Sequence, residues 1–295
     1  MNKVFKSYQV WPKFPSVSMS GNICAFNCKH CNHIYLSDMQ NLMQPEKLYN
    51  SCKKFADNGA VGFLLSGGCD KNGEMINLRK LLPTIKKIKD ETNLIIKLHT
   101  GVVDKTLAEE IISAGIDIAS VEIVGSNDSL NEIFRSSLTT QSYKNTLINL
   151  ENAGMPFIVP HVCIGLHYGK LKGEFDALDT IYDNCSPSVI VMIIFRPTKG
   201  TELENCQTSS LQDISSVIRR AKEKFTNVDI SLGCIRPRIK NRYEIEITAI
   251  DSGVTRMEIP SKKTIQYLGD NGYTVKTINA CCALPEELEN RAIDN

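Results

Sequence analysis

The chain has 295 residues, 42% of them hydrophobic, which is enough apolar material for the core of one large domain or two small ones. Its 34 Lys and Arg residues nearly balance 33 Asp and Glu residues, so bulk charge predicts binding to neither nucleic acid nor an anionic membrane. Residues 1–21 lack the apolar core of a signal peptide, and the longest apolar run, 189–195, is too short to span a bilayer. We therefore expect a cytoplasmic protein.

Short apolar runs alternate with amphipathic stretches along most of the chain, a pattern typical of repeated strand–helix units. Eight strands are predicted, at 16–20, 61–66, 94–99, 117–124, 157–164, 188–195, 228–233 and 254–259. The predicted helices between them are 45–57, 75–90, 104–113, 142–153, 171–183, 209–224 and 241–250. Glycine follows four of these helices, as is common where a helix ends: Gly59, Gly115, Gly154 and Gly253.

The predicted strands are continuous and rich in β-branched residues, as parallel strands covered by helices are. Such units favour an α/β fold with a TIM-like barrel, complete as (β/α)8 or partial as (β/α)6, whose chemistry lies at the carboxyl ends of the strands. An open doubly wound sheet is the alternative. No linker divides the chain, so we expect a lead-in at 1–15, a barrel at 16–260 and a C-terminal extension at 261–295 that covers the barrel mouth.

Eleven cysteines are many for a cytoplasmic chain, but their odd number and wide spread argue against a disulfide scaffold. Cys24, Cys28 and Cys31 in "CAFNCKHC" have the close spacing of a loop that can hold three irons of a 4Fe–4S cubane and leave the fourth open. A zinc site needs a fourth ligand, for which His33 or a distant cysteine is available. The triplet favours iron–sulfur, because a chain with so large a core does not need a zinc staple. No role is assigned to Cys52, Cys185 and Cys206.

The C-x3-C-x2-C loop after the first predicted strand, Gly67-Gly68 after the second and Ile164-Gly165 after the fifth occur in the order found in radical S-adenosylmethionine (SAM) enzymes. The sequence resembles that superfamily over almost its whole length. The resemblance implies a 4Fe–4S cluster on Cys24, Cys28 and Cys31, with SAM bound at the open iron and cleaved to methionine and a 5′-deoxyadenosyl radical. It also implies an electron donor such as ferredoxin or flavodoxin, and SAM contacts from these residues: His30, Gly67, Gly68, Glu122, Ile164, Gly165 and Arg196.

Two positions depart from the superfamily pattern. The residue before the third cysteine is usually aromatic, and here it is His30, which keeps a flat ring but adds a titratable nitrogen. The motif after the second strand is usually Gly-Gly-Glu, and here it is Gly67-Gly68-Cys69-Asp70, so the carboxylate is displaced by one position.

A closer resemblance is to the biotin synthase and lipoyl synthase branch, which inserts sulfur at unactivated C–H positions. The segments "PHVCIGLHYGK", "PTKGTELE" and "LGCIRPR" resemble an archaeal-type group related to two-protein lipoyl synthases. That resemblance implies a small-molecule or octanoylated carrier-protein substrate, a partner radical SAM subunit and a second, auxiliary iron–sulfur cluster. For its ligands we predict Cys234, Cys281 and Cys282, which a folded-back tail can bring together, with Cys69 and Cys163 as further thiols near the rim.

Two alternatives remain open from the sequence. The first is a radical SAM enzyme with a single cluster, acting as a mutase, in methylene transfer or on a peptide. The second, from another class, is a non-catalytic protein whose cysteine loop holds zinc.

Overall fold

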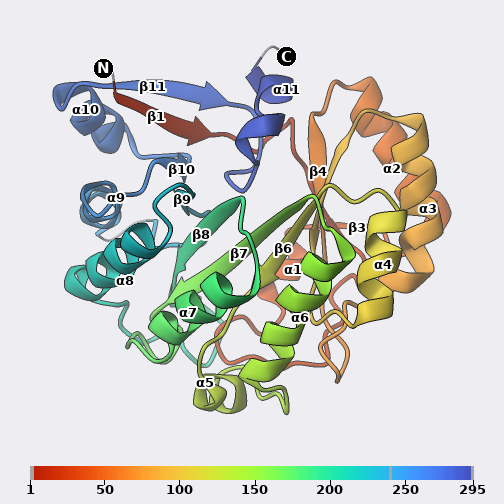
Figure 1. The fold of residues 1–295 in the computed structure, drawn as a ribbon, viewed down its shortest axis with the longest axis horizontal. Coiled ribbons are helices and arrows are strands. Elements are labelled where there is room, and N and C mark those ends of the chain that lie inside the picture. Colours follow the sequence, from red (N-terminus) through yellow and green to blue (C-terminus); the bar gives the residue numbers. More distant parts are fainter. Residues whose placement is uncertain (1–2, 239–240, 294–295) are drawn as a thin grey trace.

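The computed structural model describes residues 3–238 and 241–293, which form one curled parallel sheet with helices on its outer side (Figure 1). The sheet has eleven strands in the order β11-β1-β10-β9-β8-β7-β6-β5-β4-β2-β3. The strands are β1 Lys3–Tyr8, β2 Ser16–Ser18, β3 Gln40–Asn41, β4 Gly62–Ser66, β5 Ile95–His99, β6 Ile118–Glu122, β7 Phe157–Ile164, β8 Val189–Ile194, β9 Asp229–Leu232, β10 Arg256–Glu258 and β11 Tyr273–Ile278.

The helices follow the strands as expected for parallel crossovers. They are α1 Ile34–Ser37, α2 Pro45–Asp57, α3 Leu78–Glu91, α4 Lys105–Ser113, α5 Asn127–Glu132, α6 Thr140–Ala153, α7 Glu174–Asn184, α8 Leu211–Lys224, α9 Arg242–Asp251, α10 Lys262–Asp270 and α11 Asn290–Ile293, with a 3₁₀ turn at Glu286–Leu288. The larger hydrophobic core lies between the outer face of the sheet and these helices. No helix within the described ranges is long and apolar enough to cross a bilayer.

All eight predicted strands are present, as β2 and β4–β10, and all seven predicted helices are present, as α2–α4 and α6–α9. The four glycines predicted to end helices have positive φ angles between 69° and 116°, which suits a residue without a Cβ. The partial-barrel alternative is confirmed, because the edge strands of the sheet, β11 and β3, do not pair with each other. The protein is therefore an open half-barrel.

The strands β1 and β11 were not predicted, because "KVFKSY" and "YTVKTI" mix polar with apolar residues. They pair with each other, and β1 also pairs with β10. The segment predicted as a lead-in thus contains a strand of the sheet. The proposed domain boundaries at residues 15 and 260 stay a prediction.

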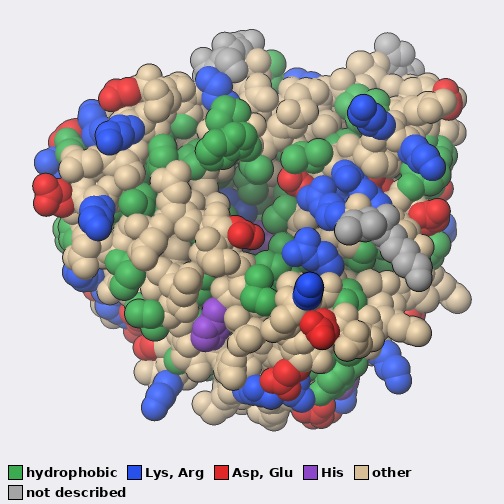
Figure 2. Space-filling model, turned by 180° about the vertical axis from the view of Figure 1, so that it is seen from behind, with side chains coloured by type: hydrophobic (Ala, Val, Ile, Leu, Met, Phe, Trp, Pro, Cys, Tyr) green, Lys and Arg blue, Asp and Glu red, His purple; other side chains and the backbone are tan. Residues whose placement is uncertain are grey.

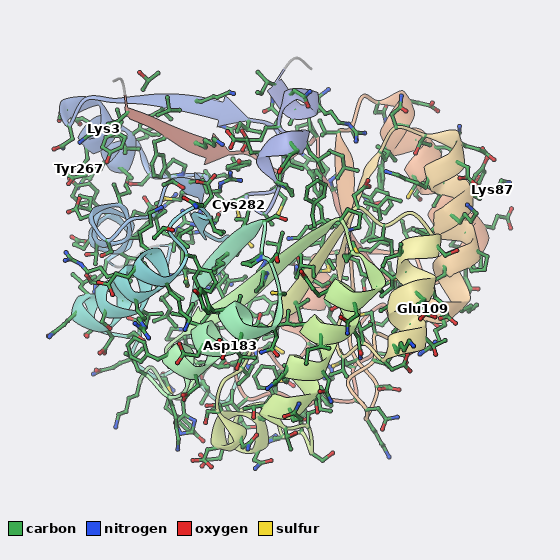
Figure 3. All side chains as sticks on the ribbon, viewed as in Figure 1. Lys3, Lys87, Glu109, Asp183, Tyr267 and Cys282 are labelled. Carbon is green, nitrogen blue, oxygen red and sulfur yellow. The ribbon has the colours of Figure 1, made fainter. Side chains whose placement is uncertain are left out.

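The segment that follows β11 enters the concave side of the sheet. Cys282, Ala283 and Leu284 are buried in a second core, against residues at the amino-terminal ends of the central strands such as Ile95 and Val189. Figure 3 shows Cys282 where this segment dips toward β7 and β8 beneath α11. The extension therefore closes the end of the half-barrel opposite the predicted mouth. The physical reason is that its apolar residues are buried there against the apolar first residues of β5–β8.

Polar contacts secure this segment to β1 and β10. The carboxylate of Glu289, which is 3% exposed, accepts hydrogen bonds from Tyr8 at 2.6 Å and Lys6 at 2.9 Å and lies 3.2 Å from Arg256. Arg256 also donates a 2.6 Å hydrogen bond to the carbonyl of Leu284. We call the inner surface formed by this segment, together with Cys234 just after β9, the floor of the half-barrel, and the carboxyl ends of β2 and β4–β7 its mouth.

Candidate active site

The loop after β2 gathers three thiols at the mouth. Cys28 is 5% exposed, and its thiol donates to the carbonyl of Phe134 at 3.7 Å. The pKa of Cys31 is lowered to about 7, chiefly by a hydrogen bond from Cys28. The pKa of Cys28 is raised by the same hydrogen bond, by burial and by the charges of Cys31 and Cys24. The three sulfurs therefore share one small region.

The loop after β4 packs directly on this cysteine loop. A Cβ on Gly68 would lie 2.2 Å from the carbonyl oxygen of Ile23 and 2.4 Å from Cβ of Cys24, so only glycine fits there. The N–H of Cys69 donates to the sulfur of Cys24 at 3.4 Å, and the N–H of Ala25 donates to the Cys69 carbonyl at 2.7 Å. Gly67 and Gly68 thus let the two loops meet, and the Cys69 amide donates a hydrogen bond to the sulfur of Cys24.

The two departures from the superfamily pattern have structural explanations. The carboxylate of Asp70 accepts from the N–H groups of Asn72 at 2.8 Å and Glu74 at 3.0 Å, so it closes its own turn. The ring of His30 packs edge-on against Phe134 with 5.2 Å between centroids. Burial lowers the pKa of His30 to about 4, so the ring is neutral and serves as a flat packing surface.

A cavity of about 170 Å³ lies inside the half-barrel next to these loops. Its wall includes the following residues: Phe26, Ser66, Gly67, Cys69, Gly73, Met75, His99, Thr100, Gly101, Val102, Ser120, Glu122, Phe134, Tyr143 and His161. Burial raises the pKa of Glu122 to about 8, so its carboxyl group holds a proton at neutral pH. Nε2 of His99 and Oγ of Ser120 are buried without a hydrogen-bond partner. The cavity therefore offers uncharged, unsatisfied polar groups to a ligand.

His161 presents a defined hydrogen-bonding group to this cavity. Its Nδ1 lies 3.0 Å from the carbonyl oxygen of Val159, and because a carbonyl only accepts, Nδ1 carries the proton. Burial lowers the pKa of His161 to about 3, so the ring stays neutral and Nε2 is an acceptor. Its ring also packs edge-on against His99, with 5.4 Å between the centroids.

A second group of thiols lies at the floor. Nζ of Lys97, which is 2% exposed, lies 3.3 Å from the sulfur of Cys281. The pKa of Cys281 is lowered to about 5, first by a hydrogen bond from Cys282 and further by the charge of Lys97. The pKa of Cys234 is raised by burial within the half-barrel and by the charge of Cys281. The side chain of Cys234 is nevertheless accessible to solvent. The charge of Cys281 raises the pKa of both Cys234 and Cys282, and the charge of Cys234 also raises that of Cys282, so the three predicted thiols interact electrostatically.

The remaining predicted SAM residues lie apart from this cavity. The carbonyl of Ile164 accepts from the N–H of Phe195 at 2.9 Å, and the N–H of Gly165 donates to Glu174 at 2.8 Å. These main-chain groups already have protein partners. Arg196 lines a neighbouring cleft of about 770 Å³ and stacks on the ring of Tyr35 at 5.5 Å. Their contact with SAM stays a prediction, as does that of His30, Gly67, Gly68 and Glu122.

Several residues of the site were not singled out by the sequence analysis. Lys97, Ser120 and His161 all occupy inward positions of β5–β7, where neighbouring residues are apolar. A lone polar residue inside an apolar parallel strand was the available signal, because such a strand is normally buried on both faces. Figure 2 shows a hollow in the face opposite the view of Figure 1, with a group of Lys and Arg side chains along one rim.

The mouth thiols are the soft ligands that an iron–sulfur cluster takes. In such a cluster each thiolate binds a different iron, so three cysteines leave the fourth iron open. The close approach of Gly68 to the cysteine loop and the Cys69 N–H aimed at Cys24 are consistent with thiolate ligands.

Comparison with known sequences gives a consistent answer. The sequence model described as the radical SAM superfamily matches residues 19–174. The biotin synthase of Campylobacter hominis is 23% identical over 244 residues, which cover 81% of this chain and 72% of that protein. The biotin synthase of Citrifermentans bemidjiense is 25% identical over 206 residues, and the match spans 66% of this chain but only 59% of the relative.

Solved structures agree on the fold. The FeFe-hydrogenase maturase HydG from Carboxydothermus hydrogenoformans has a TM-score of 0.65 at 15% identity, covering 94% of this chain and 69% of that one. Methylornithine synthase (PylB) has a TM-score of 0.59 at 17% identity, covering 88% of this chain and 74% of that one. The matched sequence model covers more than half of the chain, and it includes the cysteine loop, Gly67-Gly68 and β4–β7. The chain therefore belongs to the radical SAM superfamily, whose members use a 4Fe–4S cluster and S-adenosylmethionine.

Proposed function

We propose that this radical SAM enzyme inserts sulfur at unactivated C–H positions of a substrate bound inside the half-barrel. The observation that carries the proposal is the second group of thiols. The charge of Cys281 raises the pKa of both Cys234 and Cys282 at the floor, and the charges of Cys24 and Cys31 raise that of Cys28 at the mouth, which supports two separate groups of thiols. The low-identity similarity to biotin synthases supports the same activity.

At the mouth, the chain's own residues shape the cofactor site. When bound there, the 4Fe–4S cluster and SAM supply a 5′-deoxyadenosyl radical that abstracts hydrogen. The Cys69 amide donates a hydrogen bond to the sulfur of Cys24 and so helps to orient this ligand, and Gly68 permits the close approach of the two loops. The protonated Glu122 donates a hydrogen bond to a ligand in the cavity without adding a charge to the interior.

Between the two groups of thiols, neutral polar side chains orient the substrate. His99 and Ser120 have unused hydrogen-bonding atoms, and His161 offers an acceptor at Nε2. An amide carries one donor and one acceptor and pairs well with such a set. Phe26, Met75 and Phe134 give the same cavity an apolar wall for an alkyl chain. An octanoylated lysine of a carrier protein has both features, and this supports it as the substrate class.

At the floor, the three cysteines hold an auxiliary iron–sulfur cluster, which supplies the sulfur. Soft thiolates select such clusters, and the extension brings two of the three ligands to the site. An electron donor such as ferredoxin or flavodoxin provides the reducing equivalents, and a partner radical SAM subunit shares the reaction.

The test is an anaerobic assay of the reconstituted protein with reductant, SAM and an octanoylated carrier peptide. We expect 5′-deoxyadenosine and a peptide whose mass shows added sulfur. The Cys281→Ala variant should form 5′-deoxyadenosine but add no sulfur. Cys185→Ala is the matched control, because this half-buried thiol at the C-terminal end of α7 donates to the carbonyl of Ile181 and packs against the outer core, away from the floor.

Two results would overturn the proposal. Full sulfur addition by Cys281→Ala would show that the floor is not the sulfur source. Formation of 5′-deoxyadenosine by the unaltered protein, without sulfur addition to any octanoylated or small-molecule substrate offered, would favour the single-cluster alternative. A colourless preparation with stoichiometric zinc and no iron would remove radical chemistry altogether.

A further inference from the structure

Lys97 is a buried cation in the middle of the sheet. It is the third residue of β5, its side chain points into the half-barrel, and it is 2% exposed. Its ammonium group has one hydrogen-bond partner among the described residues, the sulfur of Cys281 at 3.3 Å. No carboxylate of the described residues forms an ion pair with it, in contrast to Lys89, whose partner Asp117 lies at 2.6 Å. The sequence thus places the charged side chain of Lys97 among the apolar residues of β5.

The groups around Lys97 do not supply an opposite charge. His99 and His161 are kept neutral by burial, and the charge of Lys97 lowers the pKa of both further. Glu258, whose charge acts on Cys234, is already paired with Arg236 and Arg238. A buried ammonium without a counter-charge is costly, so a residue of this kind implies an anionic partner. Cys281 is the atom group in position to be that partner.

We propose that Lys97 is a positioning residue for the auxiliary cluster: its ammonium group donates an N–H···S hydrogen bond to the Cys281 ligand and offsets the negative charge of the cluster. This inference rests on the proposed function, because it assumes a cluster on Cys234, Cys281 and Cys282. It also explains why a lysine is tolerated in the core of a parallel sheet.

The charge of Lys97 should change the reduction potential of the floor cluster in a predictable direction. Reduction adds an electron to a centre that thiolates already make negative, and a fixed positive charge next to a ligand favours the reduced form. Loss of the charge should therefore lower the reduction potential of the floor cluster. The mouth cluster should not respond equally, because no thiol of the cysteine loop contacts Lys97.

The experiment is a redox titration of the reconstituted protein, followed by electron paramagnetic resonance, together with iron and sulfide analysis. Lys97→Met keeps an unbranched side chain of similar length and removes the charge. We expect the ratio of reduced to oxidised floor cluster at a fixed potential to fall about tenfold, equivalent to about 59 mV for a one-electron couple. Lys105→Met is the matched control, because Lys105 is exposed at the start of α4.

The outcomes separate this inference from the proposed function. A floor cluster of unchanged potential in a folded Lys97→Met protein overturns the role of Lys97 and leaves the proposed function standing. A single cluster in the unaltered protein overturns both. If Lys97→Met does not fold, Lys97→Gln is used with the same expected shift. Lys97→Arg, which keeps the charge, should return the potential toward that of the unaltered protein, and a failure to do so in a folded variant with two clusters contradicts the inference.

Discussion

Cysteines gather at the mouth and at the floor of the half-barrel, and the two groups are assembled in different ways. The mouth thiols come from one loop of eight residues, 24–31, that packs on the loop after β4. The floor thiols come from two distant segments, the end of β9 and the extension after β11. The mouth is therefore a local motif, whereas the floor exists only when the extension docks. Changes to the extension should disturb the floor and spare the mouth.

The largest effect is expected from Cys28→Ala, at the most buried of the mouth thiols. Losing one of three ligands removes the cluster at which SAM is cleaved, so formation of 5′-deoxyadenosine should fall to background. Iron bound at the floor should remain. Both are measured in the reconstituted variant by product chromatography and iron analysis. Loss of all iron would show that the two sites are not independent.

Gly68→Ala should also act on the mouth alone. The added Cβ would lie 2.2 Å from a carbonyl oxygen and 2.4 Å from Cβ of Cys24, so the cysteine loop must move. A displacement of this order in a catalytic site lowers the rate by about a hundredfold. Gly269→Ala is the matched control, since nothing lies within 4 Å of a Cβ at that position. Equal rates for the two variants would contradict the tight fit of the loops.

Glu289→Gln tests the anchoring of the floor. The carboxylate is 3% exposed and contacts Tyr8, Lys6 and Arg256. Leaving Arg256 without this charge should lower the free energy of unfolding by about 3 kcal/mol. Thermal or urea unfolding measures this, and iron analysis should show floor iron lost before mouth iron. In Glu286→Gln the altered side chain is 78% exposed, so a change below about 0.5 kcal/mol is expected. Similar losses in both variants would contradict a specific anchor.

The last prediction concerns the pH dependence of Glu122. Its carboxyl group has a pKa raised from 4.5 to about 8, because it is buried. The folded protein then holds a proton that the unfolded chain releases, so the free energy of unfolding falls as pH rises from about 4.5 to about 8 and levels off above. Glu122→Gln should flatten this part of the curve in urea unfolding of the apoprotein. Parallel curves for the two proteins would show that Glu122 titrates normally.

The sequence predicted the repeating part of the fold, because period and composition are local properties. The apolar runs that became β4–β8 and the glycines after α2, α4, α6 and α9 needed no tertiary information. In contrast, polar and apolar residues are mixed along β1 and β11, and these two strands pair with each other. Their positions depend on contacts between the two ends of the chain, which no local pattern reveals.

The candidate site divides in the same way. The spacing of Cys24, Cys28 and Cys31 pointed to a cluster site, and the resemblance to the superfamily added Gly67 and Gly68. The trio of Cys234, Cys281 and Cys282 stays a prediction, and it was based on a tail folded over the mouth, whereas the extension packs at the opposite end of the half-barrel. Lys97 was missed, because its contact with Cys281, without a carboxylate partner among the described residues, appears only in the packed structure.

The most direct test of two separate cluster sites is iron and sulfide analysis, with Mössbauer spectroscopy, of the anaerobically reconstituted protein and a Cys234→Ala, Cys281→Ala, Cys282→Ala variant. A Cys52→Ala, Cys185→Ala, Cys206→Ala variant is the control, since it removes as many thiols from positions without an assigned role. We predict that the floor variant keeps one 4Fe–4S cluster and loses the second, while the control keeps both. Equal iron and sulfide in the floor variant and the unaltered protein would contradict the account.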